Sequence, residues 1–333
     1  MRRIGILSVG NDCPGLNAAI RSAVVNSIEF EIETMGIKDG FEGLMEDKLD
    51  VLVRNDVSGI LHLGGTILGT SLFVPEKDEE LVEIKNKTIQ YGITGYVILG
   101  GRNAVRSALN LQRYGIPSII VPATIDNDLS FTDFSIGFIT ALEHVTEALD
   151  VIHSTAESHH RVMIVKTMGG PGGWIATFGG LAGGADFVIT SSDVLNPDEL
   201  VKTIKHRYES GKRFSLVVIE EGVKLPEEII DECKCSYETD PAQVIGIYIN
   251  KKLDIEWRYT NLGYTQRGGT PSSMDRIIAT QMSARAIELV KMGKFYHAVG
   301  MKGFIVTEVP YSDTLLNVRP VDYYIKQLAK LFY

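Results

Sequence analysis

Two aspartates, Asp126 and Asp128, lie two residues apart in the stretch VPATIDNDLS, at the expected end of a strand. A carboxylate there can accept a proton from an attacking hydroxyl, and a second one can bind a divalent cation. The pair therefore indicates a phosphoryl-transfer site. Another strand ends in YVILGGRNAV, where Arg102 directly follows Gly100 and Gly101. This second stretch has the form of a similar site whose metal-binding residue is missing.

Three glycine-rich stretches also follow expected strands: SVGNDCPGLNAAIR (8–21), LGGTILGTS (63–71) and MGGPGGWIATFGGLAGGAD (168–186). Backbone amides at a helix N-terminus favour an anion. The first stretch is not the dinucleotide pattern G-x-G-x-x-G, because Asn11 stands where a glycine is needed. Each stretch alone is a weak signal, since glycine turns often serve only tight packing. Together, at strand ends, they predict phosphate-rich ligands.

Strands and helices alternate along the chain, which predicts parallel sheets with right-handed crossovers. Two sheets in series indicate two α/β domains, with ligands at the carboxyl ends of the strands. The expected strands are 3–9, 96–101, 117–124, 161–167, 186–190 and 214–221. The expected helices are 15–29, 77–91, 104–115, about 137–156, about 172–182 and 197–209.

Composition excludes several classes of protein. The chain has 333 residues, of which 44% are hydrophobic and 23% charged, and a net charge of −9, which argues against nucleic acid as a partner. No apolar run of about 18 residues is present, so we expect no membrane span, and the N-terminus is typical of a buried first strand. Three cysteines are too few for a disulfide framework and predict a cytoplasmic protein, with Cys233 and Cys235 as unpaired thiols in a polar segment.

The glycine-rich stretches, together with TIDNDLSFTDFSIGFITAL and LGYTQRGGTPSSMDRIIATQ, resemble the 6-phosphofructokinase family in their order and spacing. The similarity runs from residue 2 to the C-terminal YYIKQLAKLFY. It implies two Rossmann-like three-layer α/β domains with mainly parallel sheets and a homotetramer. The expected domains are 1–138 with 266–316 on the phosphoryl-donor side, and 139–265 with 317–333 on the sugar-phosphate side. About a dozen residues between Glu221 and Arg258, in the stretch LPEEIIDECKCSYETDPAQ (225–243), are additional to the family pattern, and we interpret them as a surface insertion.

The resemblance implies an intact site for fructose 6-phosphate. Asp126 corresponds to the catalytic base, Thr124 lies beside the transferred group, and Asp128 is close to the Mg²⁺ ion. Arg161 and Arg258 correspond to arginines that reach the sugar phosphate from a neighbouring subunit, since planar guanidinium groups suit phosphate. The other expected sugar-phosphate contacts are Ile125, Met168, Gly169, Gly170, Glu221, Tyr264, Gln266 and Arg267. Tyr264 replaces the usual histidine of the family.

The donor site departs from the family pattern. It corresponds to Gly10, Asn11, Leu72, Phe73, Gly101, Arg102, Asn103 and Ala104. Asn11 replaces a glycine, Leu72 and Gly170 replace phosphate-binding arginines, and Arg102 replaces the metal-binding aspartate. These changes predict weak or absent Mg²⁺ binding and slow turnover with ATP. Pyrophosphate as the donor is not excluded, although Ala123 supplies no charge where pyrophosphate users carry a lysine.

The effector site that bacterial members use is partly altered as well. Arg21 is kept and Asp186 corresponds to an acidic metal contact. Basic residues are replaced by Val25, His153, Ser210 and Phe214, so control by ADP or phosphoenolpyruvate is not expected.

Two functions remain open. The chain is either an enzyme that phosphorylates fructose 6-phosphate with ATP or pyrophosphate, or an impaired relative that binds sugar phosphate and regulates a catalytic paralogue in a hetero-oligomer. A purely structural subunit is disfavoured, because a scaffold needs no sugar-phosphate arginines.

Overall fold

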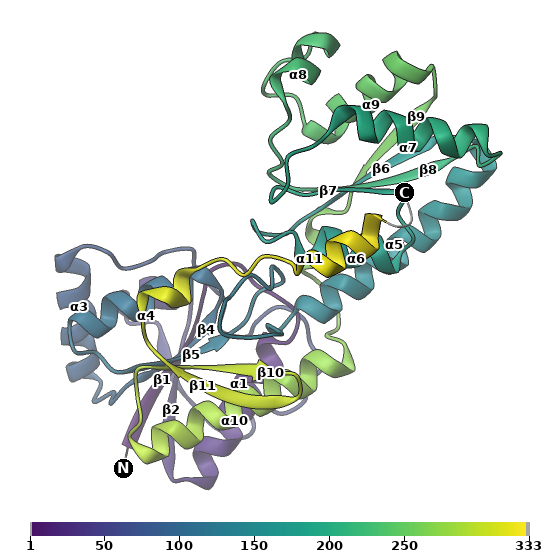
Figure 1. Cartoon of the computed structure of the whole chain (residues 1–333). Helices are drawn as coiled ribbons and strands as arrows, with labels where there is room; N and C mark the ends of the chain where they lie inside the picture. The colour runs from purple at the N-terminus through teal and green to yellow at the C-terminus, as the bar shows by residue number, and fades with distance from the viewer. Residues whose placement is uncertain (1, 331–333) are drawn as a thin grey trace. The chain divides into compact units, whose positions relative to one another are not determined.

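A computed structural model describes residues 2–330. The chain divides into two compact units, Met1–Thr140 with Arg267–Val318, and Ala141–Gln266 with Arg319–Tyr333 (Figure 1). Each unit has a sheet with helices on both faces, so the expected α/β fold class is confirmed. The assignment of a donor role to one unit and a sugar-phosphate role to the other stays a prediction.

The first unit is built on a mainly parallel sheet in the order β11-β10-β5-β4-β1-β2-β3. Only the edge strands β3 and β11 pair antiparallel within it. Its strands are β1 (Arg2–Val9), β2 (Ile32–Ile37), β3 (Leu49–Leu52), β4 (Tyr96–Gly100), β5 (Ser118–Pro122), β10 (His297–Lys302) and β11 (Ile305–Pro310). The central strands are apolar runs buried on both faces, as a parallel sheet between two helical layers requires.

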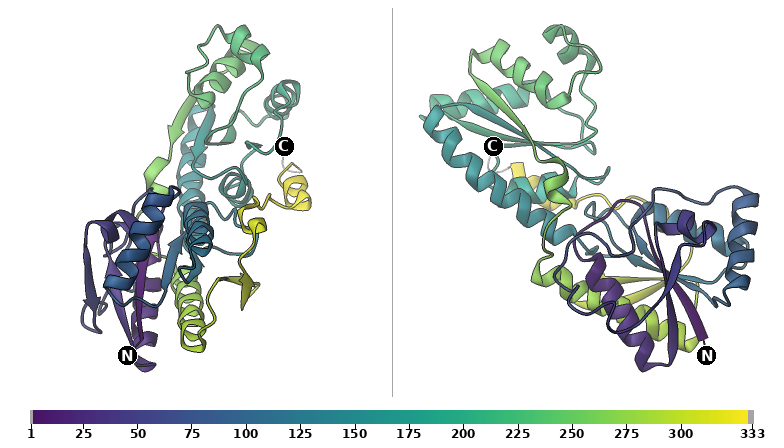
Figure 2. Two further views of the ribbon diagram at one scale, coloured as in Figure 1. Left: turned by 90° about the vertical axis from the view of Figure 1, so that its left-hand side faces the viewer. Right: turned by 180° about the vertical axis from the view of Figure 1, so that it is seen from behind.

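Helices cover both faces of this sheet. α1 and α10 pack against each other on one face, and α2, α3 and α4 lie on the other (Figures 1 and 2). Their bounds are α1 (Leu16–Glu29), α2 (Gly40–Met45), α3 (Asp78–Gln90), α4 (Arg102–Arg113) and α10 (Ser273–Met292), with a short 3-10 helix η2 (Asp313–Leu316). Helix α5 (Phe138–His159) begins in this unit and continues into the second.

The second unit has a parallel sheet in the order β7-β8-β6-β9. Its strands are β6 (Val162–Thr167), β7 (Phe187–Ile189), β8 (Ser215–Glu220) and β9 (Trp257–Asn261). α6 and α11 pack together on one side, and α7, α8 and α9 lie on the other (Figure 1). These elements are α6 (Trp174–Ala182), α7 (Pro197–Glu209), α8 (Glu227–Cys233), α9 (Pro241–Leu253), η1 (Gly263–Gln266) and α11 (Tyr323–Lys330).

Strand register determines where the first unit presents its functional residues. Val9 lies opposite Gly100, and Gly100 lies opposite Pro122. The loops after β1, β4 and β5 therefore leave the sheet at the same edge. Glycine is required at position 100, because a Cβ there would lie 2.1 Å from the carbonyl oxygen of Val9.

The segment 225–243, expected to be a surface insertion, is mostly exposed or half-buried, and its status as an insertion stays a prediction. It forms α8 and the start of α9; Ile229 belongs to the core of the second unit, and Ile230 is buried as well. Cys233 and Cys235 are partly buried against the same core, so the expectation of a polar surrounding was wrong for these two thiols. Both cysteines are free, as expected.

None of the helices in residues 2–330 combines the length and the hydrophobicity that a membrane span requires.

Candidate functional site

A cavity of about 210 Å³ opens at the carboxyl edge of the first unit's sheet. The loops after β1, β4 and β5 all contribute to it, as the strand register requires. Its lining residues are Gly10, Asn11, Gly101, Arg102, Asn103, Arg106, Thr124 and Asp126. The structure thus brings together the expected catalytic pair Thr124 and Asp126 and five of the expected donor-site residues, and it adds Arg106, which the sequence did not single out.

The loop that carries Asp126 is held rigidly by hydrogen bonds. Asn127 is fully buried with a left-handed backbone (φ 52°), a conformation that asparagine tolerates better than most residues. Its Oδ1 accepts from the amide of Ser135 at 2.9 Å, and its Nδ2 donates to the carbonyl of Asp133 at 3.1 Å. Ser135 in turn donates to the carbonyl of Thr124 at 2.7 Å.

These contacts turn the two aspartates in different directions. Asp126 lines the cavity, whereas Asp128 is buried with 1% of its surface exposed. Ile125 is also buried, with no exposed surface, so its side chain supports the loop. Only its backbone is therefore available as the expected sugar-phosphate contact.

Arg102 forms an ion pair with Asp128. Its Nη1 lies 3.8 Å from Oδ2 of Asp128, and 33% of the Arg102 side chain is exposed. Arg102 is also the first residue of α4, whose first turn contains no acidic residue. A positive charge at a helix N-terminus opposes the helix dipole and typically costs about 0.3–1 kcal/mol. One turn later, Arg106 lines the same cavity and forms an ion pair with Glu76 at 3.7 Å.

The residues around this cavity do not suit the Mg²⁺ ion that the family resemblance implies. Mg²⁺ requires oxygen ligands, mostly carboxylates and water. Here the Asp128 carboxylate lies 3.8 Å from the guanidinium of Arg102. In the described part of the chain, no group of three or more His, Cys, Asp or Glu side chains is arranged to hold a metal ion. The donor set therefore disagrees with a magnesium site, and we derive no step through this ion.

Leu72 and Phe73 line a different cavity, of about 620 Å³, in the same unit. Its other lining residues are Asp39, Glu42, Glu46, Lys48, Thr70 and Ser71. Leu72 is 64% exposed, and its apolar side chain cannot bind the phosphates that an arginine would bind at this position. Asn103 connects the two cavities, because its Nδ2 donates to the carbonyl of Leu72 at 3.4 Å. Ala104 is buried beneath this loop and lines neither cavity.

In the second unit, several expected sugar-phosphate residues meet at the carboxyl end of β6. Met168 follows β6, and its amide donates to Oε1 of Gln266 at 3.2 Å. Gln266 is fully buried and also bonds the carbonyl of Gly263 at 3.0 Å. The amide of Glu221 donates to the carbonyl of Thr167 at 2.8 Å, while its side chain is exposed. Gly169 and Gly170 continue this loop.

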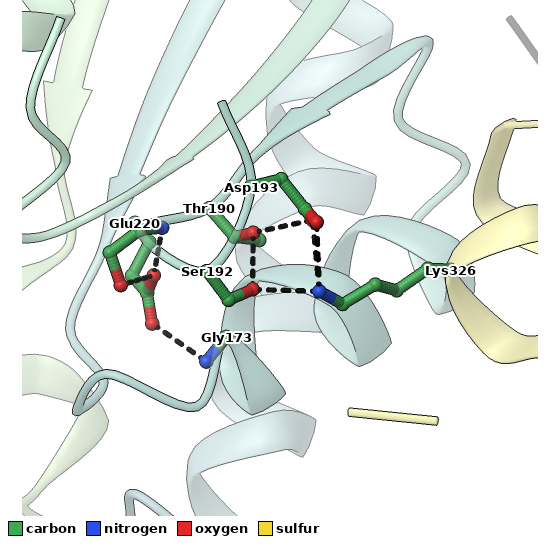
Figure 3. A network of polar contacts seen from close by, with 7 residues as sticks. Gly173, Thr190, Ser192, Asp193, Glu220 and Lys326 are labelled. Atoms are coloured by element: carbon green, nitrogen blue, oxygen red, sulfur yellow. Dashed lines mark hydrogen bonds and ion pairs between the residues drawn. The ribbon is translucent and has the colours of Figure 1, made fainter. Parts of the chain in front are cut away.

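Glu220, the neighbour of Glu221, anchors this region from inside. Its carboxylate accepts from the amide of Gly173 at 2.9 Å and from the hydroxyl of Ser191 at 2.6 Å (Figure 3). Beside it, Lys326 of α11 bonds Ser192 at 2.8 Å and Asp193 at 3.0 Å. This network joins the ends of β7 and β8 to α6 and α11, so it fixes the loop that presents Gly169 and Gly170.

Arg161 and Arg258 lie at the opposite ends of their strands, because Arg161 precedes β6 and Arg258 pairs with Met163 near its start. Both contact one carboxylate: Oε2 of Glu256 lies 2.7 Å from Nε of Arg161 and 3.9 Å from Nη2 of Arg258. At about 3.3 Å per residue, Arg161 is roughly 20 Å from Met168 along β6. The structure therefore separates these arginines from the rest of the sugar-phosphate set in the same chain.

Tyr264 and Arg267 have contrasting environments. Tyr264 lies in η1 and is 82% exposed, so its hydroxyl is available to a ligand. Arg267, in the first unit, is 7% exposed and donates to the carbonyl of Asp12 at 3.2 Å. Burial raises the pKa of the adjacent Cys13 thiol well above its ordinary value, with Asp275 adding to the effect, so this cysteine stays protonated and is no nucleophile.

The residues of the expected effector region are engaged within the chain. Asp186 forms an ion pair with Arg207 at 2.8 Å and accepts from the amide of Leu216 at 2.8 Å. Burial nevertheless raises the pKa of Asp186 to about 6. Phe214 is 6% exposed and packs edge-on against His153 at 4.9 Å between ring centroids. Whether a regulator binds here stays a prediction of the sequence.

Four residues with evident roles in these sites were missed from the sequence: Asn127, Ser135, Arg106 and Glu256. An asparagine between two aspartates was a usable signal for a left-handed turn. The spacing of Arg102 and Arg106, one turn apart, was another. Glu256 contacts Arg161, and Ser135 bonds the carbonyl of Thr124. These partners are distant in the sequence, so no local sequence pattern predicts the contacts.

Known proteins resemble this chain throughout its length. A family model described as Phosphofructokinase matches residues 3–290. A Streptomyces coelicolor protein named ATP-dependent 6-phosphofructokinase 2 is 38% identical over 96% of this chain and 96% of its own length. A Natranaerobius thermophilus protein named ATP-dependent 6-phosphofructokinase is 36% identical over 99% of both chains.

Solved structures resemble the fold. A Saccharomyces cerevisiae phosphofructokinase structure is 26% identical with a TM-score of 0.81, and it matches 100% of this chain. The chain spans 46% of that yeast chain, about half its length. A Nitrosospira multiformis structure titled pyrophosphate-dependent phosphofructokinase has a TM-score of 0.87 at 18% identity, covers 97% of this chain and 86% of its own, and shows the fold alone.

Proposed function

The chain belongs to the phosphofructokinase family, and from this premise we propose that it transfers a phosphoryl group to the 1-hydroxyl of fructose 6-phosphate. The names of the relatives favour ATP as the donor. The observation that carries the proposal is the cavity in which Asp126 and Thr124 face Arg102 and Arg106. A proton acceptor and phosphate-neutralising cations at one point are the requirements of phosphoryl transfer.

In the proposed reaction the 1-hydroxyl oxygen attacks the terminal phosphorus of the donor. The bond between that phosphorus and its bridging oxygen breaks, and the hydroxyl proton passes to the carboxylate of Asp126. The buried contacts of Asn127 hold this carboxylate in place, which lowers the entropic cost of aligning it. Thr124 lies beside the transferred group, and its hydroxyl accepts from the amide of Asp126 at 3.2 Å.

For the sugar phosphate, we propose that Met168, Gly169 and Glu221 contact the sugar, while Arg161 and Arg258 bind the 6-phosphate on a neighbouring copy. The separation of roughly 20 Å along β6 supports this division, because one small ligand cannot span both sets within a single chain. The proposal therefore requires a homo-oligomer. Light scattering of the purified chain at micromolar concentration tests it, and a monomer that still binds the sugar phosphate contradicts it.

The activity is tested with the purified full chain, fructose 6-phosphate and either ATP or pyrophosphate, in an aldolase-coupled assay. We expect turnover that depends on Asp126. Asp150→Asn is a control at an exposed acidic residue that does not line the cavity. Absence of turnover with both donors, while fructose 6-phosphate binds, would instead indicate the regulatory function, for which the names of the relatives give no support.

A further inference from the structure

The lining of the cavity at the carboxyl edge of the first unit contains more positive than negative charge, and the carboxylates that pair with its two arginines, Asp128 and Glu76, lie outside the lining. Arg102 and Arg106 line it together with one carboxylate, that of Asp126, and the remaining lining residues are neutral. At about 210 Å³ the cavity is smaller than the 300–1,000 Å³ typical of pockets that enclose a whole organic ligand. Its size and charge therefore suit a short phosphate chain better than a complete nucleotide.

Arg102 is held in this cavity by a fixed partner. Asp128 is buried, and its Oδ2 lies 3.8 Å from Nη1 of the arginine. At that distance the contact is an ion pair without a hydrogen bond. Nη1 is itself buried and makes no hydrogen bond to any described residue. The exposed third of the Arg102 side chain is the part that lines the cavity and can meet an anionic ligand.

The same geometry acts against a divalent cation. An ion at Asp128 would lie close to the guanidinium of Arg102, and two positive groups at such short range repel each other strongly. A magnesium-bound polyphosphate also has less negative charge to offer the two arginines.

We propose that this cavity binds the polyphosphate part of the donor without a divalent cation, with Arg102 as its built-in counter-charge. The inference rests on the proposed function only in taking this cavity as the donor site. A guanidinium group can donate two parallel hydrogen bonds to two oxygens of one phosphate, and it stays charged at every physiological pH. Asp128 then acts as a positioning residue that orients Arg102, and the class of ligand is a metal-free polyphosphate anion.

Calorimetry on the full chain tests the proposal, with inorganic tripolyphosphate, pyrophosphate and ATP as probes. Each is titrated once in EDTA and once in excess MgCl₂. We expect Kd in EDTA to be at least tenfold lower than in MgCl₂. If tripolyphosphate binds in EDTA, the site recognises the phosphate chain. If only ATP binds, the site recognises the whole nucleotide, and the assignment of the cavity to a polyphosphate is overturned. Tighter binding in MgCl₂ for all three probes, or no heat in EDTA, overturns the proposal.

Variants of α4 make the test specific to Arg102. Arg102→Gln should weaken binding in EDTA at least tenfold, and Arg102→Asp should reverse the sign of the magnesium effect. Arg113→Gln removes an equal charge from an exposed position of the same helix and should change neither value. If Arg102→Gln binds tripolyphosphate as the parent does, Arg102 is not the counter-charge.

Two precautions keep the result interpretable. Circular dichroism establishes that each variant is folded, and Arg106→Gln, which should also weaken binding in EDTA, replaces any variant that is not. The binding data are independent of turnover. Metal-free binding without phosphorylation of fructose 6-phosphate refutes the proposed function alone, and tight binding only as the magnesium complex refutes this inference alone.

Discussion

Removing a negative charge at Glu256 should tighten binding of fructose 6-phosphate. The Glu256 carboxylate lies 2.7 Å from Arg161 and 3.9 Å from Arg258, the two arginines expected to bind the 6-phosphate. It therefore competes with the phosphate for both guanidinium groups. Glu256→Gln keeps the size of the side chain, removes the competition and leaves the arginines in place.

The magnitude follows from the exposure of these groups. The side chain of Glu256 is 63% exposed, and those of Arg161 and Arg258 are 27% and 55% exposed. Exposed ion pairs contribute about 0.2–1 kcal/mol each, so releasing both should make about 1 kcal/mol available to the phosphate. This corresponds to an affinity that is roughly fivefold higher, since ~1.4 kcal/mol is a factor of ten.

Calorimetric titration of fructose 6-phosphate at low and high salt measures the effect. The gain should shrink as salt increases, because exposed charges are screened. Glu29→Gln is the matched control, since Glu29 forms an exposed ion pair with Arg54 at 2.8 Å in the first unit. Unchanged or weaker binding by the Glu256 variant would refute the assignment of Arg161 and Arg258 to the phosphate.

Three further predictions concern single side chains. Asp126→Asn should lower kcat at least about 100-fold, the range for loss of a general base, while fructose 6-phosphate still binds; steady-state kinetics with calorimetry measures this, and near-normal kcat contradicts it. Asn127→Ala should lower the free energy of unfolding by about 2–4 kcal/mol, because it removes two buried hydrogen bonds and the tolerated left-handed conformation; urea unfolding measures this, and a change below about 0.5 kcal/mol contradicts it. Burial raises the pKa of Asp186 from 3.8 to about 6, so between these values the folded state binds more protons than the unfolded state. The free energy of unfolding should then fall by about 2 kcal/mol as the pH rises from 4 to 6, and Asp186→Asn should remove this slope in urea unfolding at several pH values; an unchanged slope refutes the assignment.

Much of the fold could be predicted from the sequence. Strands such as Tyr96–Gly100 are continuous apolar runs, and helices such as Pro197–Glu209 have clear start signals. These local patterns were sufficient to predict both kinds of element. Five strands and five helices of the structure were not identified: β2, β3, β9, β10, β11, α2, α8, α9, α10 and α11. The edge strands β3 and β11 are short and half-exposed, with no continuous apolar run to mark them. In the segment 225–243 the charged residues hide the two buried isoleucines of α8, so its packing was not predicted.

The candidate site was predictable in identity but not in its contacts. Motif spacing located Thr124, Asp126, Arg102 and Asn103, and the strand register places them around one cavity. The sequence also indicated that Arg102 opposes a metal ion. It could not reveal that Asp128 is buried and oriented toward that arginine, since the turn of Asn127 determines the direction of its neighbours.

The most direct test of the central claim is a ³¹P NMR time course with the purified chain, fructose 6-phosphate and ATP, run in parallel with pyrophosphate, each with and without MgCl₂. The account predicts a new phosphate-ester signal from the 1-position of the sugar, lost in the Asp126→Asn variant. If fructose 6-phosphate binds and no such signal forms with either donor in any of these conditions, the chain is not a phosphofructokinase in activity, and the claim is contradicted.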